Sequence, residues 1–91
     1  MTDLHDIRRA IDAIDAEVVE RLAAREQLVR QAAGFKTDEQ AVRAPDRVEQ
    51  VIAKVRALAE TSGASPDVIE RVYRAMISAF IDLELSEHRT R

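Results

Sequence analysis

The chain has 91 residues, of which 46% are hydrophobic and 34% charged, and its net charge is −3. This balance gives no reason to expect nucleic acid or an anionic membrane as a partner, because both attract proteins with an excess of basic residues. There is no cysteine, which excludes disulfides, thiolate zinc sites and cysteine nucleophiles. Without a signal-like apolar run at the N-terminus or a bilayer-spanning segment, we expect a soluble, cytoplasmic protein.

The length suits a single domain, which we place over residues 1–91. The sequence holds one Tyr, two Phe and no Trp, so its core should be aliphatic, as suits helices packed on helices. His5 and His88 lie near opposite ends of the chain, with no partner at ligand spacing. We therefore interpret both as solvated surface residues and expect no metal site.

The first predicted element covers residues 4–36, where no proline occurs and the first glycine is Gly34, which we expect to end the helix. This stretch predicts one helix of about 30 residues, roughly 45 Å long. Its apolar residues recur mostly at heptad spacing, at Leu4, Ile7, Ile11, Ile14, Val18, Leu22 and Leu28. A compact monomer of this size would have a radius of gyration of about 12–13 Å. A second copy related by two-fold symmetry is the simplest cover for the stripe, so we predict an intertwined homodimer.

Two cations follow on the same face of this helix. The next heptad position after Val18 is Arg25, and Lys36 lies eleven residues further along the chain. A cation on a packing seam is costly unless an anion meets it. The plainer alternative is that Arg25 pairs with a glutamate or extends to the surface.

The next stretch, residues 35–44, is polar and weakly patterned, and we interpret it as a loop. The loop is either a functional lid or a plain connection between two helices. Pro45 and Asp46 suit the start of a second helix of about 17 residues, which should fade near residues 62–63. Ser65 and Pro66 predict the start of a third helix of about 23 residues, which should fray over residues 88–91. The predicted fold class is all-α, with one long and two shorter helices.

The third helix carries an anomaly. Its apolar stripe runs through Tyr73, Ile77 and Phe80, and the next position is Glu84. A glutamate near a chain end is most often solvated. Together with Arg25 and Lys36, however, a carboxyl group in an apolar stripe indicates a pocket for a small anion, which arginine can bind through two parallel hydrogen bonds.

Arg8 is a further candidate for this pocket, but it precedes Arg25 by 17 residues. In one helix the two side chains would lie some 25 Å apart along the axis and about 100° apart around it. Two antiparallel or crossed copies could bring them to one ligand. If both bind the same molecule, the pocket is shared between subunits.

At this point the sequence resembles the all-helical chorismate mutases over nearly its whole length. The resemblance is strongest to the branch that contains the isochorismate pyruvate lyases of salicylate and siderophore synthesis, including the loop length between Lys36 and Arg47. The residues that carry it are Ile7-Arg8, Ile11, Ile14-Asp15, Leu22, Ala24-Arg25, Phe35-Lys36, Ala44-Pro45-Asp46-Arg47-Val48 and the tail from Ile81 to Arg89.

The resemblance implies a domain-swapped dimer of three-helix chains with two active sites, each built from both subunits. By position, Arg8 of the partner subunit and Arg25 would each hold one carboxylate of a small dicarboxylate substrate. Lys36 would reach its ether oxygen and a carboxylate from a loop that orders over the ligand, and Arg47 would lie at the pocket edge. Glu84 stands where many members carry a glutamine that binds the ether oxygen.

The chemistry implied is the pericyclic rearrangement of chorismate to prephenate, in which negative charge develops on the ether oxygen as its bond to the ring breaks. It requires a folded substrate and donors aimed at that oxygen, and no metal, cofactor or general base. Glu84 is a departure, since a carboxylate would repel the developing charge whereas a protonated acid could donate. Val48 is another, because some mutases carry a glutamate there for the substrate hydroxyl.

These departures leave the substrate open. Chorismate mutase, an enzyme of aromatic amino acid biosynthesis, is our first expectation. Isochorismate pyruvate lyase, as the main or a second activity, is the alternative, and a mutase of the 4-amino analogue of chorismate is a minor option. A non-catalytic helical dimerisation module would explain the long helix equally well, but it would not explain Arg25 and Lys36 on one face or Glu84 in a stripe.

Overall fold

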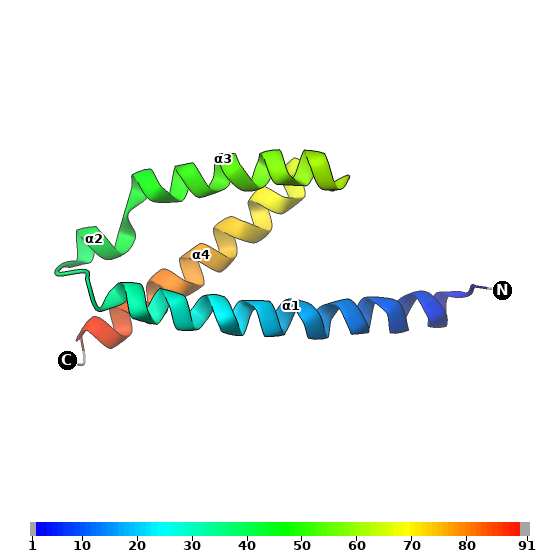
Figure 1. Cartoon of the computed structure of the whole chain (residues 1–91), viewed down its shortest axis with the longest axis horizontal. Helices are drawn as coiled ribbons and strands as arrows, with labels where there is room; N and C mark the ends of the chain where they lie inside the picture. Colours follow the sequence, from blue (N-terminus) through cyan, green and yellow to red (C-terminus); the bar gives the residue numbers. More distant parts are fainter. Residues whose placement is uncertain (1, 90–91) are drawn as a thin grey trace.

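The computed structural model describes residues 2–89, and every element in this range is a helix. Three helices are long, and a short one connects the first two of them (Figure 1). In chain order they are α1 (Leu4–Ala33), α2 (Glu39–Arg43), α3 (Pro45–Ser62) and α4 (Pro66–Arg89). The all-α prediction, with one long and two shorter helices, is confirmed. The predicted fraying of the last helix concerns residues 88–91, of which Thr90 and Arg91 lie outside the described range.

Helix α1 has the length predicted, 30 residues. It starts with a capping box, in which the Asp6 amide donates to Asp3 Oδ1 at 2.9 Å. It ends at Ala33, just before Gly34 as predicted, but Gly34 remains right-handed, with φ at −62°. A tight turn closes the helix instead, and the Lys36 amide donates to the Ala33 carbonyl at 3.1 Å. Lys36 therefore lies beyond α1, in the turn that follows it.

The segment predicted to be a loop of about ten residues contains helix α2, so that part of the prediction was wrong. The Asp38 carboxylate caps α2, accepting from the Ala41 amide at 2.8 Å. Val42 anchors the helix, with a relative exposure of 3%. Between α2 and α3, Ala44 has φ at 38° and ψ at 62°, a left-handed conformation that turns the chain sharply into Pro45.

Helices α3 and α4 form an antiparallel pair with a buried aliphatic seam that includes Ile52, Val55 and Ala59. Gly63 ends α3 in the left-handed conformation, with φ at 78°, which favours glycine because it has no Cβ. On the outer side, Arg74 of α4 bonds both carboxylate oxygens of Glu49 on α3, at 2.9 and 3.0 Å. This pair helps to fix the register of the two helices.

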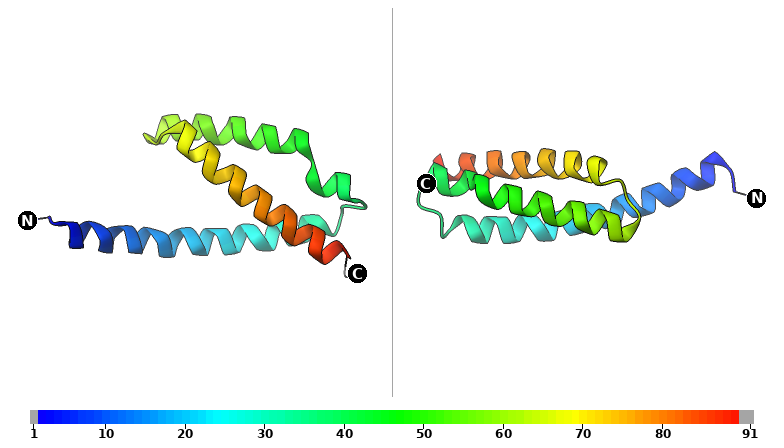
Figure 2. Two further views of the ribbon diagram at one scale, coloured as in Figure 1. Left: turned by 180° about the vertical axis from the view of Figure 1, so that it is seen from behind. Right: turned by 90° about the horizontal axis from the view of Figure 1, so that it is seen from above.

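Helix α1 crosses α4 near the C-terminal ends of both helices, where Arg30 forms an ion pair with Glu87. Its N-terminal half projects away from the other helices in all views (Figures 1 and 2). The radius of gyration is 16.1 Å and the extents are 56 × 26 × 15 Å, against about 12–13 Å for the radius of a compact chain of this size. The elongated shape expected from the length of α1 is therefore present.

The projecting half of α1 leaves its apolar stripe uncovered. From Thr2 to Arg21 every residue is exposed except Asp6. The stripe residues Leu4, Ile7, Ile11, Ile14 and Val18 have relative exposures of 46–60%. Exposed apolar residues in a continuous stripe of this kind indicate an interaction surface.

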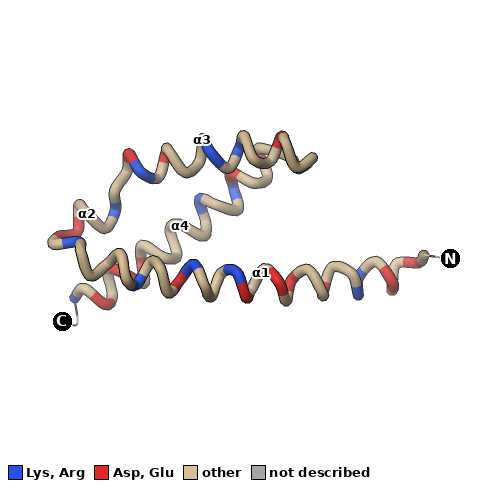
Figure 3. Tube along the Cα trace, in the orientation of Figure 1, with Lys and Arg blue, Asp and Glu red and all other residues tan. Residues whose placement is uncertain are grey.

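Basic and acidic positions alternate along the long helices (Figure 3). Basic positions lie on the C-terminal half of α1 and on the segment that leads through α2 into α3 (Figure 3). Of the helices described, none has a stretch apolar enough and long enough to cross a membrane.

Candidate functional site

A pocket of about 330 Å³ opens between the C-terminal half of α1, helix α2, the start of α3 and the second half of α4. Four of the residues singled out in the sequence line it, namely Arg25, Lys36, Arg47 and Glu84. These residues lie up to 59 positions apart in the sequence (84 minus 25) and come from four separate segments. The fold thus brings together the cations and the carboxyl group that the sequence left on separate elements.

The walls of the pocket are mostly apolar. They are formed by Leu28, Val29, Ala32, Val42, Ala44, Val48, Val51, Ile77, Phe80 and Ile81. Small-molecule sites commonly combine such walls with a few polar groups that fix the orientation of the ligand. Val48, where some mutases carry a glutamate, is one of the wall residues, so this part of the α3 wall offers no polar group.

Lys36 and Glu84 form the polar end of the pocket. The Lys36 Nζ lies 3.0 Å from Glu84 Oε2 and 3.3 Å from Oε1. Glu84 is buried, with 5% relative exposure, whereas the Lys36 side chain is 26% exposed. The expectation that Glu84 is solvated is therefore excluded: the glutamate lies inside, where it needs the ammonium group as a partner.

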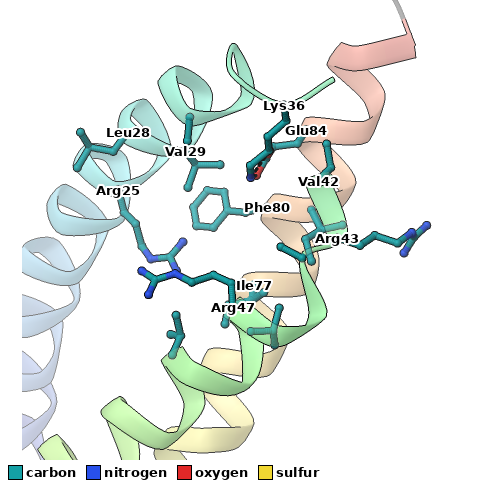
Figure 4. Close-up of a pocket in the computed structure, with 15 residues that line it drawn as sticks. Arg25, Leu28, Val29, Lys36, Val42, Arg43, Arg47, Ile77, Phe80 and Glu84 are labelled. Carbon is teal, nitrogen blue, oxygen red and sulfur yellow. Dashed lines mark hydrogen bonds and ion pairs between the residues drawn. The ribbon is translucent and has the colours of Figure 1, made fainter. Parts of the chain in front are cut away.

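Arg25 and Arg47 form the cationic part of the pocket. Their guanidinium groups enter it from α1 and from the first turn of α3, and they point toward one another (Figure 4). Within residues 2–89 neither takes part in an ion pair, although Arg25 is half-buried. The guanidinium of Arg25 lies over the ring of Phe80, 5.4 Å from the ring centroid. Within residues 2–89, the alternative in which Arg25 pairs with a glutamate is therefore wrong.

Arg43 also borders the pocket but has a different partner. Its side chain points away from the opening (Figure 4) and bonds Glu39 within α2, at 2.9 and 3.1 Å. Neither Arg43 nor the buried Val42 was singled out in the sequence, since α2 itself was not predicted. Phe80 was placed in the apolar stripe of the last helix, and its position four residues before Glu84 was the sequence feature that could have marked it as a site residue.

Arg8 is not part of this pocket. It lies in the projecting half of α1, is exposed, and forms no ion pair with any described residue. It precedes Arg25 by about 25 Å along the helix. A single chain therefore cannot bring Arg8 to the ligand that Arg25 would bind.

Metal ligation was not expected, and no three His, Asp or Glu side chains within residues 2–89 come together as a potential metal site. His5 is exposed on the first turn of α1, and His88 is half-buried near the end of α4. The functional groups of the pocket are two guanidinium groups, an ammonium and a carboxyl group.

These features define the class of protein: an all-helical chain with an apolar pocket whose cationic groups suit a small organic anion. The model of the chorismate mutase type II family matches residues 7–85, and the chain belongs to this family. It is also similar to the isochorismate pyruvate lyase of Pseudomonas aeruginosa, with 36% identity over 80 residues, which are 88% of this chain and 79% of that protein. The resemblance drawn from the sequence motifs is confirmed.

Proposed function

We propose that the chain is a homodimeric enzyme that catalyses a pericyclic reaction of a chorismate-type dicarboxylate, with the rearrangement of chorismate to prephenate as its first activity. The observation that carries this proposal is the convergence of Arg25, Arg47 and Lys36 in one apolar pocket. Cations aimed at one small volume repel each other, and a dianionic ligand would offset that repulsion.

The proposed substrate is held at its carboxylates. Arg25 binds one carboxylate through two N–H groups of its guanidinium, and Arg47 adds positive charge at the pocket edge. Arg8 of the partner subunit binds the other carboxylate. Fixing both ends favours the folded conformer in which the enolpyruvyl side chain lies over the ring, which is the geometry that the rearrangement requires.

The rearrangement breaks the ether C–O bond as a C–C bond forms between the enolpyruvyl methylene and the ring, with no atom gained or lost. Negative charge grows on the ether oxygen in the transition state. Lys36 donates to that oxygen, and the apolar walls strengthen the interaction because they exclude water. Glu84 contributes when it is protonated, since only then can it donate a hydrogen bond to the same oxygen.

Dimerisation completes the site in this proposal. The uncovered stripe from Leu4 to Val18 needs an apolar surface, and Leu58, Val68 and Val72 at the far end of α3 and α4 are apolar residues with exposures of 54–57%. A second copy with its α1 laid across that end would cover both surfaces. The same arrangement would carry Arg8 of the partner subunit toward the pocket.

The second candidate is an isochorismate pyruvate lyase, and it is favoured by the similarity to the lyase of that name from Pseudomonas aeruginosa. Isochorismate would lose pyruvate through a related pericyclic hydrogen transfer and leave salicylate. The same cations would serve, because the carboxylates and the ether oxygen that must be stabilised are equivalent.

Product analysis tests the proposal. Purified protein is incubated separately with chorismate and isochorismate, and the products are separated by chromatography. Prephenate formed faster than salicylate is the expected result. Faster release of salicylate and pyruvate would establish the second candidate, and no turnover of either acid would contradict both.

An Arg25→Ala variant separates an enzyme from a non-catalytic dimerisation module. In an enzyme, loss of a guanidinium–carboxylate interaction lowers kcat/KM by about a hundred-fold or more, with the dimer intact in sedimentation. Arg71→Ala is the matched control, since Arg71 is an exposed arginine on α4, outside the pocket, with no ion pair among the described residues. Dissociation of the Arg25→Ala dimer would instead indicate a structural role for Arg25.

A further inference from the structure

Arg25 is held in the pocket without an acidic partner. Its side chain is half-buried, and among residues 2–89 its charged group has one aromatic neighbour, the Phe80 ring, at 5.4 Å from the centroid. Arg47 reaches into the same opening (Figure 4). Two guanidinium groups in one partly apolar space repel each other, so Arg25 needs a contact that holds it there.

Two other arginines near this end of the chain are held by carboxylates. Arg43 bonds Glu39, and Arg30 pairs with Glu26 and Glu87. A carboxylate partner orients an arginine, but it also occupies its N–H donors and neutralises its charge. Such an arginine would be a poor receptor for the carboxylate of a ligand.

An aromatic face orients the cation in a different way. The negative face of the ring attracts the guanidinium plane and takes none of its five N–H donors, which lie in that plane. The contact is also apolar, so it remains stable when a ligand displaces water from the pocket. Phe80 is on α4, one helical turn before Glu84, and the contact therefore links the orientation of Arg25 to the helix that also carries the buried carboxyl group.

We propose that Phe80 is a positioning residue: its ring holds the Arg25 guanidinium toward the pocket with its N–H donors free for a substrate carboxylate. This role rests on the proposed function, in that the ligand bound by Arg25 is the chorismate-type dicarboxylate. Phe80 itself acts through Arg25. The plainer alternative is that the ring only fills space between α1 and α4.

Two substitutions at this position separate the alternatives. Phe80→Leu keeps apolar bulk but removes the ring face, whereas Phe80→Tyr keeps the face. With the substrate that the wild type converts, Phe80→Leu is expected to raise KM by about two- to five-fold, with a smaller change in kcat. Phe80→Tyr should restore most of the loss. Tyr73→Leu is the matched control, because it removes an aromatic ring from the same side of α4, two turns away and outside the pocket.

A measurement on the protein alone follows the contact directly. A proton above an aromatic ring resonates upfield, so the Nε–H signal of Arg25, assigned by its loss in Arg25→Lys, should be shifted upfield in the wild type and in Phe80→Tyr. It should return to the ordinary position in Phe80→Leu and stay upfield in Tyr73→Leu. A residue that only fills space would not produce this pattern together with the change in KM.

The outcomes are distinct. A rise in KM for Phe80→Leu with an unchanged Arg25 signal, or an equal rise for Tyr73→Leu, would overturn the positioning role and leave the proposed function standing. A wild-type protein that converts neither chorismate nor isochorismate would overturn the proposed function, and the role of Phe80 toward that substrate would fail with it.

Discussion

Lys36 and Glu84 face each other across the polar end of the pocket, with the ammonium nitrogen 3.0 and 3.3 Å from the two carboxylate oxygens. They come from the turn after α1 and from the last third of α4. The contact holds the proposed ether-oxygen donor in place. It also directs that donor at a carboxylate, which would compete with the substrate for it.

The first prediction concerns the hydrogen-bonding group at position 84. The Glu84 carboxylate repels the charge that develops on the ether oxygen, and it attracts Lys36 away from that oxygen because the two side chains form an ion pair. Glu84→Gln supplies an amide donor in place of the carboxylate. It should therefore raise kcat/KM, measured with the accepted substrate at neutral pH.

Glu87→Gln is the control for this prediction, because Glu87 lies on the same helix outside the pocket-lining set and pairs with Arg30. Its kcat/KM should stay close to that of the wild type. If Glu84→Gln is no more active than the wild type, Glu84 does not have the proposed role.

The second prediction concerns assembly. Ile11 lies in the middle of the exposed stripe of α1, with 50% exposure. In a single chain, Ile11→Asp would change an exposed position and affect stability by less than about 0.5 kcal/mol. In the proposed dimer it would bury a charge, so sedimentation should show dissociation, and circular dichroism should show loss of helix at micromolar concentration.

Ala16→Asp is the matched control, because Ala16 is exposed on the opposite side of the same helix. It should leave assembly unchanged. A monomeric wild type, or a dimer that tolerates Ile11→Asp, would show that the stripe is not the dimer interface.

The structure also shows which of its features could be predicted from sequence. The bounds of α3 and α4 were predictable because local chemistry sets them: Pro45 and Pro66 suit a first turn, and Gly63 adopts the left-handed conformation that ends α3. Helix α2 was missed because its five residues are too few to show a periodic pattern. It is held by the Asp38 cap and by burial of Val42, which depends on α4.

The candidate site was predictable to a similar degree. Arg25 and Glu84 stood out because each places a charged group in an apolar stripe. Lys36 was found by its spacing of eleven residues after Arg25, and the motifs supplied Arg47. The contact between Arg25 and Phe80 was not predictable, since it depends on the angle and height at which α1 crosses α4. The place of Arg8 depends on a second chain, so it remains a prediction.

The third prediction concerns stability in acid. A hydrogen bond from Arg74 lowers the pKa of Glu70 below its ordinary value of 4.5, and a hydrogen bond from Arg56 lowers it further. A group whose pKa is lowered by folding stabilises the folded state above its ordinary pKa, and this contribution is lost as the pH falls through the lowered value. Glu70→Gln should therefore be less stable than the wild type at neutral pH, and the difference should shrink below about pH 4.

Urea denaturation at several pH values measures this difference in the free energy of unfolding. Glu60→Gln is the control, since Glu60 is an exposed glutamate on α3 without a side-chain ion pair among the described residues. A difference between wild type and Glu70→Gln that is constant with pH would contradict the assignment to the ion pairs.

The central claim, a dicarboxylate site shared by two copies of the chain, is tested most directly by mixing two inactive variants. Arg8→Ala and Arg25→Ala chains are unfolded together in equal amounts and refolded, and the activity is compared with that of each variant alone. If each site takes Arg25 from one chain and Arg8 from the other, every mixed dimer has one intact site, and random pairing restores about a quarter of the wild-type activity. If the mixture is no more active than the two variants refolded separately, each site lies within one chain, and a pocket shared between subunits is contradicted.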